Sequence, residues 1–270
     1  MNQLKIGTLN VASASKERAR RIIDEWITPS GFDLYVLTET SEGAGSILIT
    51  SELKEAGWSV FQRPTLSKDR GVAIVSRVAA TESSIYPTTD PGPGRSIVLD
   101  LHTTPPIQVV GMYVPNRGND PAKTARKKAF LSCWLSYLVE SSRANRRCIL
   151  IGDLNIVPPA QQPLFLPQEP FEYAWYRQMA GSCRLYDAAV KHHSGHESTW
   201  VANTGEGYTY DHIMIHESLA THVIGFSYNH TTRSRGGVTD HSALALTLSI
   251  ESLEFRDLKM HAAPKQATLF

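Results

Sequence analysis

Eight short runs of apolar, largely β-branched residues recur along the chain and constrain its fold more than any other feature. They are residues 4–11, 34–38, 72–76, 97–101, 107–114, 148–151, 212–215 and 243–248. Runs of this length and composition are typical of buried β-strands. We therefore expect a protein that is built on β-sheets.

Two segments between these runs have the spacing of amphipathic helices. Apolar residues share one face over residues 15–27, and Pro29 and Gly31 then follow as signals that end a helix. The second pattern begins at Pro121, directly after Asp120, a residue type that commonly caps helices. Because each helix has one apolar face, we expect both to pack against a sheet.

Helices alternate with strands early in the chain, and strands follow one another closely later, which favours a layered α/β domain. We expect a sandwich of mixed sheets with the helices outside. The 270 residues are compatible with a single domain of this kind, and we assign residues 1–250 to it. The regular pattern fades after Ile250, so residues 251–270 are expected to form a tail.

The charge balance is close to neutral, with 27 Lys and Arg residues against 26 Asp and Glu residues. The chain has no overall basic excess, so a nucleic-acid partner would need a local basic patch. The three cysteines have no metal-like spacing and are expected to be reduced thiols. No apolar stretch is long enough for an export signal or a membrane span. We therefore expect a cytoplasmic protein.

Polar residues stand at the ends of the apolar runs, where a buried strand would not place them without cause. The set consists of Asn10, Glu39, Asp153, Asn155, Asp211, Asp240 and His241. Each residue follows or opens a predicted strand, so all are expected at one rim of the sheets. A carboxylate in such a position is costly unless it is paired or bound to a cation. Because the carboxylate and amide ligands are hard oxygen atoms and no thiolate is present, the pattern favours Mg²⁺ or Mn²⁺.

Each of these residues has a simpler interpretation when it is taken alone. An Asp or Asn at a strand end is more often a turn former than a ligand. His241 is compatible with a half-buried histidine bonded to the backbone, and Glu39 with a loop carboxylate in water. We interpret His192, His193 and His196 as part of a solvated loop rather than a metal site. Only the order of these residues and the short motifs around them, taken together, favour a shared site.

The motifs around these residues resemble those of the endonuclease/exonuclease/phosphatase superfamily, which includes deoxyribonuclease I and the exonuclease III type of apurinic endonuclease. The resemblance covers residues 4–248. It is carried by TLNV around Asn10, LTET around Glu39, IGDLNIVP around Asp153, and TDH, which ends at His241. The implied fold is a four-layered α/β sandwich of two mixed β-sheets with flanking helices.

The resemblance also implies a role for each residue of the set. Glu39, Asn10 and Asp240 are implied to bind the metal, which is Mg²⁺ or Mn²⁺. Asp153 is implied to orient or deprotonate the attacking water, with Asn155 fixing its geometry. The implied reaction is the in-line attack of this water on a phosphodiester.

The remaining implied roles concern the phosphate. His241 is implied to donate to a phosphate oxygen, with Asp211 behind it holding the ring. Tyr113 and Asn116 in GMYVPN, and Arg95 in GRSIVLDL, are implied to add phosphate contacts. Tyr113 is counted with the catalytic residues, and Arg95, Asn116 and Trp200 are counted with those that bind substrate.

Two further positions resemble the DNA-repair branch of the superfamily, and one departs from it. Trp200 in STW and Asp187 in LYDAAV resemble positions of that branch, although Trp200 fits a buried core residue equally well. Many apurinic endonucleases have an Asp two residues after the early Asn, whereas this sequence has Ala12. The departure leaves open whether one or two metal ions bind.

The sequence favours DNA as the substrate, because motifs of inositol phosphatases are absent and the segments 147–159 and 187–200 resemble the repair branch. We expect a metal-dependent DNA endonuclease or exonuclease, acting as a monomer in DNA repair or processing. A phosphatase that acts on a soluble or lipid phosphoester is the alternative enzyme. A catalytically silent DNA-binding homologue is the alternative from another class, and the retained site residues argue against it.

The last five residues, QATLF, resemble the short peptide by which bacterial repair and replication proteins dock on the sliding clamp. Gln266, Leu269 and Phe270 stand at the positions that matter, and the last two would enter an apolar pocket as anchors. The alternative is that this apolar pair covers the domain itself.

Overall fold

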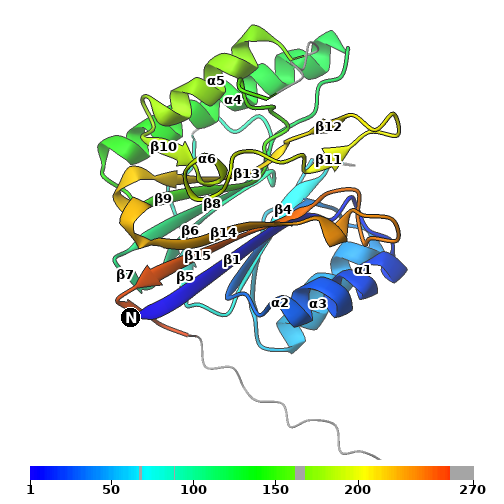
Figure 1. Ribbon diagram of the computed structural model, residues 1–270, viewed down its shortest axis with the longest axis vertical. Helices are drawn as coiled ribbons and strands as arrows, with labels where there is room; N and C mark the ends of the chain where they lie inside the picture. The colour runs from blue at the N-terminus through cyan, green and yellow to red at the C-terminus, as the bar shows by residue number, and fades with distance from the viewer. Residues whose placement is uncertain (67–68, 88, 162–167, 256–270) are drawn as a thin grey trace, which may run out of the picture.

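Two six-stranded mixed β-sheets pack face to face in the computed structural model, and helices cover both outer faces (Figure 1). The structure describes residues 1–66, 69–87, 89–161 and 168–255. The expected four-layered α/β sandwich is therefore confirmed. In Figure 1 the layers follow one another from α4 and α5, through the two sheets, to α1 and α3.

The first sheet has the order β14–β15–β1–β2–β4–β3. Its strands are β14 (Val223–Asn229), β15 (Ala243–Ile250), β1 (Asn2–Asn10), β2 (Leu34–Thr40), β4 (Gly71–Ser76) and β3 (Ser59–Gln62). β1 and β2 run parallel, and the other neighbours are antiparallel. The central pair therefore ends at one edge of the sheet, and β15 begins there.

The second sheet has the order β10–β13–β9–β8–β6–β5 and repeats this plan. Its strands are β10 (Leu185–Asp187), β13 (Asp211–His216), β9 (Cys148–Asp153), β8 (Ile107–Tyr113), β6 (Ser96–Leu101) and β5 (Ala80–Glu82). β8 and β9 form its parallel pair. Two short antiparallel pairs complete the strands: β7 (Thr103–Thr104) with β16 (Ser252–Leu253), and β11 (Trp200–Val201) with β12 (Gly207–Tyr208). All eight predicted runs form strands.

Two groups of helices form the outer layers. The first sheet carries α1 (Lys16–Ile22), a π-helical stretch (Ile23–Ile27), α2 (Thr28–Ser30) and α3 (Ala44–Glu55), and the second carries α4 (Pro121–Arg143) and α5 (Pro170–Ala180). The short α6 (Ala188–His192) follows β10, and two 3₁₀ turns, Glu217–His222 and His230–Thr232, flank β14.

The two predicted helices are present, with one correction at an end. Asp120 caps α4 by accepting hydrogen bonds from two backbone amides of the first turn, as predicted. The prediction that Pro29 ends the first helix is wrong, because α2 includes it. Gly31 follows with a left-handed φ of 61°, which a glycine adopts without strain, and ends the helical segment.

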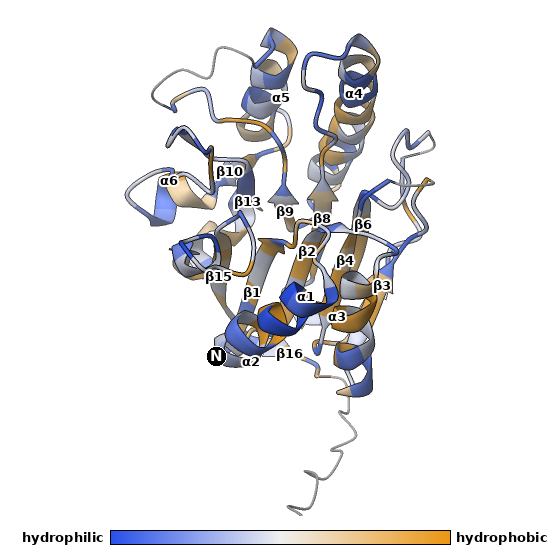
Figure 2. Ribbon diagram, turned by 90° about the vertical axis from the view of Figure 1, so that its right-hand side faces the viewer, coloured by the Kyte–Doolittle hydropathy of each residue, from blue (hydrophilic) through white to orange (hydrophobic). Residues whose placement is uncertain are grey.

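Apolar side chains fill the spaces between the layers. One cluster lies between the sheets, one between the second sheet and α4 and α5, and one between the first sheet and α1 and α3. Figure 2 shows the hydrophobic residues concentrated in the strands, whereas the outward side of α1 is hydrophilic. Two closely packed sheets give the strand ends a rigid base.

The described chain stays attached to the sandwich beyond the predicted boundary at residue 250. β16 pairs with β7, and Phe255 bridges to Val78. Residues 256–270, which include the predicted clamp-binding Gln266, Leu269 and Phe270, lie outside the described residues. Among the helices that the structure describes, none is long and apolar enough to cross a membrane.

Candidate active site

The polarity of the strands brings the predicted polar residues to one edge of the sandwich. In the second sheet, Tyr113 ends β8, Asp153 ends the parallel β9, and Asp211 begins the antiparallel β13. Asp153 is the register partner of both neighbours. In the first sheet, Asn10 ends β1, and His241 lies two residues before β15. Residues from distant parts of the sequence therefore meet at the same edge.

Asp153 owes its position to the glycine before it. Gly152 has a φ of 136°, and a Cβ atom there would lie 2.3 Å from the carbonyl oxygen of Met112. Only glycine tolerates both this backbone conformation and this close approach of β9 to β8. The GD pair of the IGDLN motif thus places the Asp153 carboxylate beside the end of β8.

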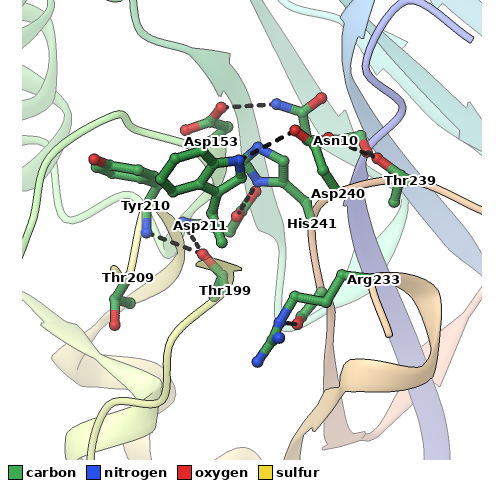
Figure 3. Close-up of polar contacts among 12 residues, drawn as sticks. Asn10, Asp153, Thr199, Thr209, Tyr210, Asp211, Arg233, Thr239, Asp240 and His241 are labelled. Atoms are coloured by element: carbon green, nitrogen blue, oxygen red, sulfur yellow. Dashed lines mark hydrogen bonds and ion pairs between the residues drawn. The ribbon is translucent and has the colours of Figure 1, made fainter. Parts of the chain in front are cut away.

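The Asp153 carboxylate is held on both sides by amide donors (Figure 3). The side-chain amide of Asn10 donates to Oδ2 at 2.8 Å, and the backbone amide of Asn155 donates to Oδ1 at 2.9 Å. Asn155 is fixed in turn by a hydrogen bond of 2.9 Å from its side-chain amide to the carbonyl oxygen of Val114. These contacts leave Asp153 one orientation, facing the open edge.

His241 and Asp211 form the predicted pair. The Nδ1 atom of His241 lies 2.7 Å from Oδ2 of Asp211, and Figure 3 shows the carboxylate directed at the ring. The other carboxylate oxygen, Oδ1 of Asp211, is buried and has no hydrogen-bond partner among the described residues. Thr199 accepts from the backbone amide of Asp211 at 3.1 Å and fixes the start of β13.

Burial and neighbouring charges together raise the pKa values of both Asp153 and His241. Burial, and then the carboxylates of Asp211 and Glu39, raise the pKa of Asp153 to about 7, against the opposing influence of His241. Burial lowers the pKa of His241, but Asp211, Asp153 and Asp240 together outweigh it and raise the pKa to about 10. At neutral pH, Asp153 is therefore able to accept a proton while His241 is a cation.

Glu39 reaches the site from an irregular point of β2. The pairing of β2 with β4 shifts register between Thr38 and Thr40, and Glu39 between them has a left-handed φ of 54°. A left-handed glutamate is uncommon, and such strain concentrates at functional sites. The hydroxyl of Tyr113 donates to Oε1 of Glu39 at 2.9 Å, and Nε of Arg70 lies 3.5 Å from Oε2. The irregularity turns the carboxylate toward the shared edge.

Asp240 lies at the exposed rim, where Trp200 orients it. The indole Nε1 of Trp200 donates to Oδ2 of Asp240 at 3.1 Å. The Trp200 ring stacks near Tyr208 at 6.4 Å between centroids, and Tyr210 lies at 5.9 Å. Trp200 is half-buried, so the interpretation of it as a core residue is wrong. Together the three rings form an aromatic wall beside the acidic edge.

These residues surround a cavity of about 320 Å³. Its lining consists of Glu39, Asn116, Arg117, Gly118, Asn119, Lys127, Asp153, Asn155, Glu172, Trp200, Tyr210, Asp240 and His241. Of the other predicted site residues, Asn10, Tyr113 and Asp211 lie directly behind this lining, in contact with it. Sequence reasoning missed Arg117, Asn119, Lys127, Glu172 and Tyr210. Two predicted residues pointed to parts of this set: Asn116 of GMYVPN precedes Arg117 and Asn119, and Asp211 follows Tyr210.

Arg95 lies elsewhere, behind Tyr113. Its guanidinium group packs 4.6 Å from the centre of the Tyr113 ring, donates to the Tyr113 carbonyl oxygen at 3.4 Å and pairs with Asp69. The side chain is buried and does not line the cavity. Its predicted contact with phosphate stays a prediction, and the structure shows it supporting Tyr113.

The donor set fits a divalent cation that prefers oxygen ligands. The buried carboxylates of Asp153 and Asp211 lie within 4.8 Å of each other and of His241, and one oxygen of Asp211 lacks a partner among the described residues. A cation at this edge would offset their repulsion. Asn10 is already engaged, since its amide nitrogen contacts Asp153 and its oxygen accepts from the backbone amide of Ala12 at 2.8 Å. Its role as a ligand therefore stays a prediction.

Comparison with solved structures shows the same fold in DNA-processing enzymes. A 3′-5′ exonuclease, NExo, from Neisseria meningitidis is 21% identical with a TM-score of 0.76, over 91% of this chain and 100% of that one. An AP endonuclease from Archaeoglobus fulgidus is 22% identical with a TM-score of 0.76, over 92% and 100% of the two chains. A structure of the 3′ phosphatase NExo from Neisseria, bound to a product DNA hairpin, is 20% identical with a TM-score of 0.75, over 91% and 99%.

At these identities the structural likeness establishes the fold. No curated protein matches the sequence. Residues 7–241, however, match the endonuclease/exonuclease/phosphatase family, and this span contains every residue that the site brings together from both sheets. The chain belongs to the endonuclease/exonuclease/phosphatase family.

Proposed function

We propose that this hydrolase is a Mg²⁺- or Mn²⁺-dependent phosphodiesterase that cleaves DNA, as an endonuclease or exonuclease in DNA repair or processing. The observation that carries the proposal is the pairing of a proton acceptor with a cation across one cavity. Asp153 and His241 both line the cavity, and their pKa values are shifted to about 7 and about 10. Such a pair suits the attack of water on an anionic phosphodiester.

Asp153 is placed to orient the attacking water and take its proton. A general base is most effective when its pKa lies near the working pH, and burial brings the pKa of Asp153 to about 7. The amides of Asn10 and Asn155 fix the carboxylate, so that it does not have to reorient during the reaction. Asn155 supplies the rigid support, which agrees with its predicted role.

His241 is placed to donate to a non-bridging phosphate oxygen. Its Nδ1 atom is bound to Asp211, which leaves Nε2 as the free donor of the protonated ring. Because Asp211 raises the pKa of His241, the ring keeps its positive charge at neutral pH. The phosphate then receives a fixed, charged hydrogen-bond donor, whose effect is strongest where charge develops.

Glu39 and Asp240 are the residues that would hold the metal ion, with Asn10 as the third predicted ligand. A bound divalent cation supplies Lewis-acid stabilisation of the phosphate charge. Tyr113 fixes one oxygen of Glu39, and Trp200 fixes one oxygen of Asp240. Partners of this kind commonly orient carboxylates that bind metals.

Two features of the cavity support a nucleic acid as the substrate. The aromatic wall of Trp200, Tyr208 and Tyr210 offers ring faces on which a base or a sugar can pack. On the opposite side, the segment after β8 contributes Arg117 and Asn116 to the lining, which are donors suited to a phosphate backbone. A protein of the same fold, the 3′ phosphatase NExo from Neisseria, is bound to a product DNA hairpin in its solved structure.

A substrate panel tests the proposal directly. We expect purified protein to cleave at least one of plasmid, single-stranded, abasic or 3′-blocked DNA in the presence of Mg²⁺ or Mn²⁺. The pattern of products distinguishes endonucleolytic from exonucleolytic cleavage. Hydrolysis of small or lipid phosphoesters without any cleavage of DNA would establish the alternative phosphatase. Binding of DNA without hydrolysis of any substrate would establish the catalytically silent homologue.

We also propose that the C-terminal segment QATLF binds a bacterial sliding clamp. This proposal rests on the sequence alone. Deleting Gln266–Phe270 should abolish binding to the clamp in a calorimetric titration, because Leu269 and Phe270 are the apolar anchors. Cleavage of DNA in the absence of the clamp should remain unchanged. An intact protein without affinity for the clamp, or an unchanged affinity after the deletion, would end the idea. Monomeric state and cytoplasmic location stay predictions.

A further inference from the structure

Three buried polar side chains hold the backbone of the segment that follows β9. Lys127 donates from Nζ to the carbonyl oxygen of Asn155 at 2.6 Å. Nε2 of His212 lies 2.9 Å from the carbonyl oxygen of Ile156, and the Gln168 side chain binds both the carbonyl and the amide of Val157, at 2.7 and 2.6 Å. The exposed fractions of Lys127, His212 and Gln168 are only 2%, 1% and 7%. Each side chain binds the backbone of one of three consecutive residues, and we call the three side chains the 155–157 supporting residues.

Lys127 is the one of the 155–157 supporting residues that also lines the cavity. It comes from α4, in the outer layer, and its ammonium pairs with Oε1 of Glu172 at 2.5 Å. Glu172, on α5, pairs through its other oxygen with Nε of Arg117 at 2.9 Å. A buried lysine is costly unless it is paired and hydrogen-bonded. The ammonium meets both conditions here, through the carboxylate of Glu172 and the carbonyl oxygen of Asn155.

A second cluster contains residues of the types that bind metals. The hydrogen bonds of His212 account for this cluster without a metal ion. Asp187, His196 and His212 bring ligand atoms within 4.8 Å of one another. Nδ1 of His212 lies 2.7 Å from Oδ2 of Asp187, while its Nε2 faces the carbonyl oxygen of Ile156. Because both nitrogens face acceptors, the ring is a protonated donor on both sides. The interpretation of His196 as part of a solvated loop is wrong, since it also contacts Asp187, at 3.1 Å.

The 155–157 supporting residues hold a backbone in an unfavourable conformation at Asn155. Asn155 has a left-handed φ of 48°, a conformation that a non-glycine residue keeps only when its surroundings enforce it. The same residue donates its backbone amide to the Asp153 carboxylate at 2.9 Å. The carbonyl that Lys127 holds and the amide that binds Asp153 belong to adjacent peptide units joined at the Cα atom of Asn155, so a change in the Asn155 backbone angles would move one relative to the other.

We propose that Lys127 is a positioning residue for the hydrolytic reaction, which acts by fixing the carbonyl of Asn155 and, through Asn155, the orientation of Asp153. The inference rests on the proposed function. Lys127 contributes no proton and binds no substrate in this role. The side chain lines the cavity only because it reaches the carbonyl of Asn155 from behind.

Replacing Lys127 tests the role through the balance of kinetic constants. We expect Lys127→Met to lower kcat on the cleaved DNA about 30-fold or more, since a misplacement of about 1 Å in a catalytic group can cost about 100-fold. KM should stay within about threefold, because the substrate contacts are untouched. Lys127→Arg keeps a charged donor and should recover about tenfold of the lost kcat. A folded Lys127→Met protein with kcat within about threefold of wild type would overturn the proposal.

A matched variant controls for lost stability. Asp33→Asn breaks another ion pair of a buried carboxylate, with the partly exposed Arg77, directly before β2 and at the opposite end of it from Glu39. Its kcat should equal that of wild type, and an equal loss in both variants would show that Lys127 acts only on the fold. If Lys127→Met does not fold, the double variant Lys127→Met, Glu172→Gln removes both fully buried charges and leaves only Arg117, whose side chain is 11% exposed, without its carboxylate partner. It should show the same loss of kcat, and wild-type kcat would again reject the role.

Hydrogen exchange provides a readout that does not depend on activity. In Lys127→Met, the backbone amides of Asn155 and Val157 should exchange about tenfold faster, while those within β9 exchange at the wild-type rate. Unchanged exchange at Asn155 would overturn the positioning role. If the wild-type protein cleaves no phosphoester at all, the proposed function fails, and the exchange measurement still decides whether Lys127 holds the segment.

Discussion

Replacing Asp153 with Asn should lower kcat for DNA cleavage by about 100- to 10,000-fold, the range expected when a general base is removed. The amide keeps the shape of the carboxylate and one of the two oxygens that accept from Asn10 and Asn155, but it takes no proton from water. KM should change little, because Asp153 acts on the water rather than on the DNA. Initial rates at saturating substrate with Mg²⁺ or Mn²⁺ measure the effect.

The same variant should be at least as stable as wild type. Burial and the neighbouring carboxylates raise the pKa of Asp153 to about 7. An acid with a raised pKa destabilises the folded state when it is ionised, so a neutral amide removes that cost at and above neutral pH, and this gain outweighs the one hydrogen bond that the amide loses to Asn10 or Asn155. Thermal unfolding should therefore show a Tm no lower than that of wild type.

Asp100→Asn is the matched control for this substitution. Asp100 lies on β6 of the same sheet, is exposed, and accepts a hydrogen bond of 2.9 Å from the Gln108 side chain. The change in chemistry is identical, but the residue is not in the cavity lining. Its kcat should equal that of wild type. A wild-type rate for Asp153→Asn would reject Asp153 as the base, and a large loss in Asp100→Asn would show that the assay reports on the fold.

Removing divalent cations should abolish activity completely. Treatment with EDTA, followed by removal of the chelator, should leave a folded protein without activity, and Mg²⁺ or Mn²⁺ should restore it. The physical reason is that the carboxylates of the acidic edge and the phosphate together need more positive charge than His241 and Arg70, which reach this edge, supply. Activity that persists in the chelator would reject a metal-dependent reaction.

Glu39→Gln should separate the metal from the rest of the site. The amide oxygen preserves the hydrogen bond from Tyr113, but the side chain loses the charge that attracts a cation. We expect the Mg²⁺ concentration for half-maximal activity to rise about 10-fold or more, with partial recovery of the rate at high metal concentration. Glu140→Gln, an exposed position on α4, provides the control and should behave as wild type. An unchanged metal requirement in Glu39→Gln would remove Glu39 from the ligand set.

The strands and the polar residues at their ends were predictable from the sequence, because both depend on local patterns. A buried strand needs a short apolar run, and a carboxylate directly after such a run is visible without any knowledge of its neighbours. The edge strand β14 escaped prediction because its residues alternate between half-buried and exposed positions and Gly225 interrupts its pairing. α3 escaped because its sequence begins with Ala, Gly and Ser. Gly45 in its first turn packs so closely on Ala14 that a Cβ atom would clash.

The sequence by itself determined which residues meet at the candidate site: the acidic and amide groups at the ends of β1, β2 and β9, and the Asp240–His241 pair before β15. Only the tertiary structure decided what surrounds them. Lys127 and Glu172 lie on helices of the outer layer and reach the cavity through packing against the second sheet, whereas Arg95 turns behind Tyr113. The physical reason is that strand ends follow from local periodicity, while contacts between layers depend on pairing and packing among segments far apart in the chain.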